Sequence, residues 1–177
     1  YALGPAQALG VDDPLVRTIP TIWQDTPAPY GPLFLWVGKL MIPFAQDQLL
    51  AVVVAHRVLA LAGLALIGWA LLRLGRRFGA DPAVVLWLGL ANPMVLFHLV
   101  SGVHNEALML GLMLAGLEIG LGRSWLAGAV LISAAAMVKL PAALALGFLG
   151  VHLARRWGGP QARPWTRVRH VVGAAGL

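Results

Sequence analysis

The chain has 177 residues, of which 59% are hydrophobic and only 11% are charged, against about 25% charged residues in an average soluble domain. A chain this apolar cannot cover its surface with polar groups in water, which excludes both an ordinary soluble domain and a disordered chain. The net charge of +6 does not indicate a nucleic-acid partner, because membrane proteins collect Arg in their cytoplasmic loops. We therefore predict an all-α, polytopic transmembrane helix bundle in the plasma membrane, with no nucleic acid bound.

The first 48 residues are broken by Pro and Asp too often to span a membrane, so we expect residues 1–48 to form an outer loop. Its densest motif runs from Trp23 to Pro32, where three prolines stiffen the backbone. Pro32 suits the first turn of a helix lying along the membrane surface. Asp25 and Tyr30 either form the roof of a site above the membrane, or serve as a turn former and an interfacial anchor.

Long apolar segments follow, and a spanning helix needs about 20 such residues. We expect a transmembrane region at residues 49–154, with spans at 49–72, 83–100, 107–121, 125–139 and 141–154. A basic cytoplasmic loop at residues 155–170 and the start of a further span at 171–177 come next. Because the chain begins with Tyr1 and ends inside an apolar run, we also expect it to be an internal piece of a longer protein.

Residues 125–154 permit either one long kinked helix or a hairpin that turns near Lys139 and Pro141. The hairpin brings nine Arg to one side of the membrane and leaves Arg17, Lys39 and Lys139 on the other. The positive-inside rule favours this arrangement of five spans, with the Arg-rich loops in the cytoplasm. Most of the acids then gather on the outer face, where we expect any chemistry.

Four polar residues lie at the outer ends of the second and third spans: His98, His104, Asn105 and Glu106. Two histidines six residues apart with one Glu are a weak metal-ligand pattern, so we expect neither a metal nor another cofactor. Asn105 and Glu106 suit the N-terminus of a helix, and their side chains also suit hydrogen bonds to sugar hydroxyls.

Two basic residues are candidate partners for a lipid phosphate. Arg57 lies inside the first expected span, and Lys139 lies at an outer turn. An intramembrane Arg is costly and tends to be paired or functional, although Arg57 can also extend its head group to the membrane surface. The Lys139 ammonium suits phosphate as a point charge.

Three runs of the sequence resemble the actinobacterial polyprenol-phosphomannose-dependent α(1→6)-mannosyltransferases, which are integral membrane glycosyltransferases of the GT-C type. The runs are Asp25–Trp36, Asn92–Met109 and Val138–Ala142. The second run is the most specific, and the family often has Asp where this chain has Glu106. The resemblance extends along almost the whole chain.

This resemblance implies a GT-C-like fold with an outward-facing active site. The donor would be mannose on a polyprenyl phosphate, and the acceptor a lipid-anchored α(1→6) mannan, as in lipomannan precursors of the cell envelope. The principal acid, which activates the acceptor hydroxyl, would lie upstream of Tyr1, and Asp25 would assist it. The expected substrate-binding residues are Tyr30, Arg57, His98, His104, Asn105, Glu106 and Lys139.

Two other classes of function compete with the enzyme. A transporter or lipid flippase would use Arg57 and the kink at Pro93 to form a path, but the sequence has no internal repeat at a fixed period. A structural subunit would use the outer polar residues only as caps and anchors. The glycosyltransferase remains our first hypothesis.

Overall fold

The computed structural model describes residues 3–45 and 48–158, and every regular element in these ranges is helical. This confirms the all-α prediction for the described part of the chain. The chain divides into two compact units, residues 1–30 and 31–177. The predicted further span at 171–177, and the predicted basic loop from residue 159 onward, lie outside the described residues.

The first unit consists of three short helices, α1 (Pro5–Leu9), α2 (Pro14–Thr18) and α3 (Thr21–Gln24). Pro5 and Pro14 stand in the first turns of their helices, where a missing N–H costs nothing. The Asp13 carboxylate caps α2 by accepting a hydrogen bond from the backbone of Leu15 at 2.8 Å. The segment expected as a loop is therefore largely helical, because its prolines start helices as well as interrupting them.

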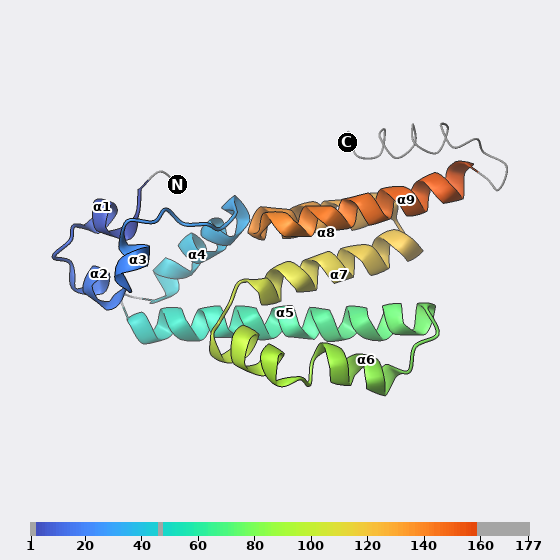
Figure 1. The fold of residues 1–177 in the computed structure, drawn as a ribbon, viewed down its shortest axis with the longest axis horizontal. Coiled ribbons are helices and arrows are strands. Elements are labelled where there is room, and N and C mark those ends of the chain that lie inside the picture. Colours follow the sequence, from blue (N-terminus) through green and yellow to red (C-terminus); the bar gives the residue numbers. More distant parts are fainter. Residues whose placement is uncertain (1–2, 46–47, 159–177) are drawn as a thin grey trace. The chain divides into compact units, whose positions relative to one another are not determined.

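The second unit contains one long helix and several shorter ones (Figure 1). Its elements are α4 (Pro32–Ala45), α5 (Leu49–Arg77), α6 (Pro82–Gly89), the π-helix η1 (Val95–Ser101), α7 (Glu106–Gly122), α8 (Trp125–Val138), the 3-10 turn η2 (Leu140–Ala143) and α9 (Leu144–Gly158). The helix expected to begin at Pro32 is α4. Its start is tied to the end of α8, because Gly31 donates its backbone N–H to the carbonyl of Val138 at 2.9 Å.

Helix α7 is the centre of this unit and packs against both α5 and α8 (Figure 1). On the α5 side, a Cβ added at Gly63 would lie 2.5 Å from the backbone of Ala107. On the α8 side, a Cβ added at Gly116 would lie 2.8 Å from the carbonyl oxygen of Gly128. Small residues therefore let the backbones of three helices come into contact, as is common in membrane helix bundles.

Helices α8 and α9 form a hairpin rather than one long kinked helix. The turn consists of Lys139 and η2, and the two helices share a buried cluster around Ile132 and Leu149. Trp125 at the start of α8 meets Trp157 near the end of α9, with ring centroids 5.8 Å apart, so the helices are antiparallel.

The far end of α7 is held to α5 by a buried carboxylate. The Glu118 side chain is 5% exposed and accepts hydrogen bonds from Arg73 at 3.0 Å and from Arg77 at 3.2 Å. Pairing with two guanidiniums offsets the cost of burying this carboxylate, which would be large if either partner were lost. The last turns of α5 and α7 are therefore clamped together.

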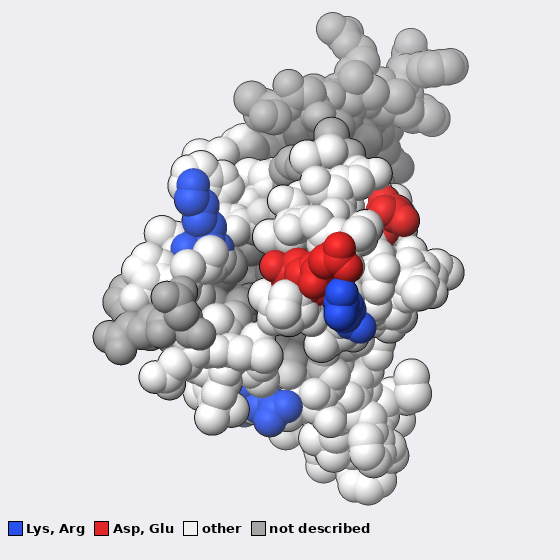
Figure 2. All heavy atoms as spheres, turned by 90° about the vertical axis from the view of Figure 1, so that its left-hand side faces the viewer, with Lys and Arg blue, Asp and Glu red and all other residues white. Residues whose placement is uncertain are grey.

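One described helix, α5, is long and apolar enough to cross a membrane. A second candidate appears if η1 and α7, which meet at 109°, count as one bent span. The expected segment 83–100 is not a continuous helix, because α6 ends before Asn92 and Pro93 and η1 begins after them. Large apolar side chains such as Phe97 and Phe148 are exposed. Figure 2, which looks along the long axis of Figure 1, shows a mostly uncharged surface with separate small patches of acidic and basic side chains.

The close helix contacts predict that a methyl group is not tolerated on the inner face of α8. In a Gly128→Ala variant of the full-length protein, the new Cβ would lie 2.4 Å from the Cα of Gly120. We expect a loss of about 1–3 kcal/mol from overpacking, seen as a lower melting temperature in detergent. Gly147→Ala is the matched control, because a Cβ at Gly147 meets nothing within 4 Å. Equal melting temperatures for the two variants would contradict this packing.

Candidate functional site

Polar side chains gather where α7 begins and α8 ends. Glu106 is the first residue of α7, and Lys139 directly follows the last residue of α8. The Lys139 ammonium donates a hydrogen bond to the Oε1 atom of Glu106, so the two residues form an ion pair between the helices. The Glu106 carboxylate also lies in the first turn of α7, where the helix dipole favours a negative charge.

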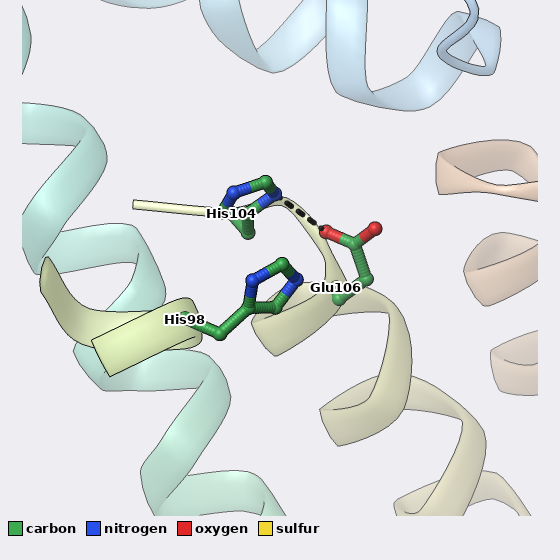
Figure 3. Close-up of side chains that lie close together, drawn as sticks. All are labelled: His98, His104 and Glu106. Carbon is green, nitrogen blue, oxygen red and sulfur yellow. Dashed lines mark ion pairs between the residues drawn. The ribbon is translucent and has the colours of Figure 1, made fainter. Parts of the chain in front are cut away.

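Two histidines lie beside this ion pair (Figure 3). The rings of His98 and His104 are stacked, with centroids 3.9 Å apart and planes inclined by 19°. The Nδ1 atom of His104 lies 3.4 Å from the Oε2 atom of Glu106, the oxygen that Lys139 does not bind. The two stacked imidazoles and the carboxylate thus come together from η1, from the connecting loop and from α7.

Asn105 lies directly behind these groups and is almost fully buried, with 5% of its surface exposed. It occupies the N-cap position of α7, but its side chain makes no capping hydrogen bond. Among the described residues, its Nδ2 atom has no hydrogen-bond partner. Asn105, His104 and His56 line a small cavity of about 10 Å³, which is the space of one water or one hydroxyl group. The Asn105 amide is therefore an unused buried donor.

The backbone between η1 and α7 is shaped to bring these side chains together. Val103 has a φ of +52°, a conformation that is an outlier for a β-branched residue. A Cβ at Gly102 would lie 2.8 Å from the His104 ring, so only glycine fits beside it. π-Helices and strained residues concentrate at functional sites, and here both occur within one connection.

The structure thus joins five of the eight residues singled out in the sequence, namely His98, His104, Asn105, Glu106 and Lys139. Asp25 and Tyr30 belong to the first unit, and Asp25 is exposed after the end of α3. Arg57 is exposed on α5, and no contact among the described residues links it to the cluster. Lys139 was expected to be a phosphate partner, and its ammonium already neutralises Glu106.

Sequence reasoning assigned no role to Glu118 or His56. Glu118 forms ion pairs with Arg73 and Arg77. These two arginines are four residues apart and therefore lie on one helix face, which is the sequence feature that could have indicated a shared acidic partner. His56 lies 2.9 Å from the carbonyl oxygen of Val52 through Nδ1, so that nitrogen carries the proton.

The chemical capacity of the cluster follows from these groups. The carboxylate accepts hydrogen bonds, the amide and the imidazoles donate or accept them, and the ammonium has further N–H groups for an anionic oxygen. The helices behind the cluster are apolar. The fold and the site therefore define an all-helical protein with a polar site at one end of an apolar bundle, suited to ligands that carry hydroxyl and anionic groups.

Comparison with known proteins gives the family. The model of the alpha-(1->6)-mannopyranosyltransferase N-terminal domain matches residues 1–155, so the chain belongs to this family. The resemblance noted in the sequence is confirmed. A probable alpha-(1->6)-mannopyranosyltransferase of Mycolicibacterium smegmatis is 43% identical over an alignment covering 90% of this chain and 34% of that protein.

Two relatives from Corynebacterium glutamicum are similar to the chain as well. Alpha-(1->6)-mannopyranosyltransferase A is 38% identical, covering 93% of this chain and 36% of that protein, and the B protein is 40% identical, covering 100% and 31%. The chain thus spans about a third of the length of the curated relatives it matches. No solved structure matches it.

The ion pair between Glu106 and Lys139 predicts a measurable coupling. In the full-length protein, Lys139→Met leaves a half-buried carboxylate without its cation, and Glu106→Gln removes the charge from the same pair. We expect the double variant to lose less unfolding free energy than the sum of the single losses, by about 1–3 kcal/mol in denaturant titrations.

The exposed pair of Arg17 and Asp12 is the matched control for this cycle, with side chains 66% and 88% exposed. Exposed pairs couple by about 0–1 kcal/mol. A coupling for Glu106 and Lys139 no larger than that of the control would mean that the pair does not hold α7 to α8.

Proposed function

We propose that the protein containing this chain transfers mannose from a polyprenyl-phosphate donor to an α(1→6) mannan acceptor at the outer face of the membrane. The observation that carries the proposal is the match of residues 1–155 to the mannosyltransferase family together with a polar cluster at one end of an apolar bundle. The lipomannan type of acceptor follows the resemblance of the three sequence motifs.

The orientation of the site rests on the two ends of α7. Glu106 and Lys139 lie at one end, and Glu118 with Arg73 and Arg77 lies at the other. The positive-inside rule assigns the Arg-rich end to the cytoplasm and the Glu106 end to the outer face. We propose five spans, with α6 and η1 together as the second and the hairpin of α8 and α9 as the last two.

The proposed reaction is a direct displacement. The acceptor hydroxyl oxygen attacks the anomeric carbon of mannose while the bond from that carbon to the phosphate oxygen breaks. The hydroxyl proton passes to a carboxylate, and polyprenyl phosphate leaves as an anion. We propose that the principal carboxylate lies outside this chain and that Asp25 assists it. A β-linked donor then gives the α-linked product.

The cluster binds the substrates in this proposal. His104, Asn105 and Glu106 bind sugar hydroxyls. The Nδ2 atom of Asn105 has no hydrogen-bond acceptor among the described residues, and a sugar hydroxyl supplies one. His98 borders the sugar, and Tyr30 is a further substrate-binding residue in this proposal. Lys139 fixes Glu106 and turns its remaining N–H groups toward the phosphate, and Arg57 contacts a lipid phosphate.

Transfer assays on membranes that contain the full-length protein test the proposal. With synthetic polyprenyl-phosphate mannose and an α(1→6) mannose oligomer, the unmodified protein should form an elongated product. Glu106→Gln should lower the rate by about 10–100-fold, because a hydrogen bond to a charged group is worth about 1.5–3 kcal/mol. Asp25→Asn should lower it as well.

Asp81→Asn is the matched control, because this aspartate only caps α6 by accepting hydrogen bonds from Ala83 and Val84, and Asn caps equally well. We expect full activity from this variant. A rate for Glu106→Gln equal to that of Asp81→Asn would remove Glu106 from the site. Absence of transfer by the unmodified protein would overturn the proposed reaction.

A further inference from the structure

Three potential ligand atoms converge at the bend between η1 and α7. One ring nitrogen of His98, one of His104 and one carboxylate oxygen of Glu106 all lie within 4.8 Å of one another. Figure 3 shows the two imidazole rings stacked on one another, with the Glu106 carboxylate beside the His104 ring. Two imidazoles and one carboxylate form one of the ligand sets that proteins use for zinc with an open fourth position.

The sequence alone does not predict a metal site here, because two histidines six residues apart with one Glu are a weak metal-ligand pattern. The fold adds the 109° bend between η1 and α7. The positive φ of Val103 and the close approach of Gly102 to the His104 ring complete the turn. The strained backbone at Val103 thus brings the His104 ring onto the His98 ring.

The two oxygens of Glu106 have separate environments. Oε1 accepts the hydrogen bond from Lys139. Oε2 is buried, has no hydrogen-bond partner among the described residues, and lies 3.4 Å from Nδ1 of His104. Carboxylates that bind metals in proteins are themselves oriented by hydrogen bonds, and Lys139 orients Glu106 in this way through Oε1.

We infer that His98, His104 and Glu106 bind a divalent first-row transition cation of the zinc type, which joins η1 to α7 across the bend. This site goes beyond the proposed mannosyl transfer and does not depend on it. The cation lies between His104 Nδ1 and Glu106 Oε2, which are 3.4 Å apart, and because imidazole binds a metal through an unprotonated nitrogen, a proton on that nitrogen passes to water. A water molecule or another oxygen ligand completes the coordination.

Geometry and ligand type select the class of cation. Zinc lies about 2.0–2.2 Å from nitrogen and oxygen ligands, so the donor atoms of a tetrahedral site are roughly 3.3 Å apart. The His104 Nδ1 and Glu106 Oε2 atoms already have about this separation, and one ring nitrogen of His98 lies within 4.8 Å of the ligand atoms that His104 and Glu106 offer. Imidazole suits zinc, copper and nickel, whereas magnesium and calcium prefer sites made of oxygen ligands.

The experiment is a metal titration of the full-length protein, purified without a histidine tag and stripped with a chelator. We expect one Zn²⁺ per chain by calorimetry, and Co²⁺ should give the visible absorption bands of a four-coordinate site. His98→Gln and His104→Gln should each weaken binding at least about 10–100-fold, the loss that even changes around a metal site cause. His98 is exposed, so its variant tests the site without removing a buried group.

His152→Gln on α9 is the matched control and should bind the cation as the unmodified protein does. Binding that is equal in all four proteins would identify an adventitious ion only and overturn the site. Absence of stoichiometric binding in the unmodified protein would overturn it as well. The transfer assay measures mannosyl transfer separately, so failure of the cation site and failure of the proposed reaction are distinguishable.

Discussion

The arrangement of the second unit depends on the close packing of α7 between α5 and α8. Gly63 and Gly116 let the neighbouring backbones approach, and an ion pair holds each end of α7. Glu106 and Glu118 are twelve residues apart, which is about 18 Å along a helix. Because α7 is fixed at both ends and along both faces, the polar cluster at its start has a defined place. The strained connection at Val103 is held by the same packing.

The two ion-pair sites have different chemical consequences. Glu118 accepts three hydrogen bonds from the guanidiniums of Arg73 and Arg77, so its charge is paired and it clamps α5 to α7. Glu106 uses one oxygen for Lys139 and keeps the other beside His104. The buried amide of Asn105 is likewise unused by the described residues. These buried polar atoms, which lack a partner among the described residues, lie together at the Glu106 end of the bundle, where we propose that the sugar is bound.

The sequence predicted the features that local rules determine. Composition gave the helical class, Pro32 marked the start of α4, and the break near Pro141 became the turn of the hairpin. The partners of the site residues could not be predicted, because Glu106 and Lys139 are 33 residues apart and meet only through the packing of α7 on α8. The stacking of His98 on His104 depends on a π-helix and a positive φ, for which the residue types give no signal.

The central claim is that the Glu106 end of the bundle faces outward, and it can be measured with single cysteines in a cysteine-free full-length protein. Leu140→Cys lies in the exposed turn beside Lys139, and Ala80→Cys lies in the exposed loop after the Arg-rich end of α5. In intact cells, an impermeant maleimide should label Leu140→Cys, and it should label Ala80→Cys only after the membrane is opened. Labelling of Ala80→Cys alone in intact cells would contradict the account.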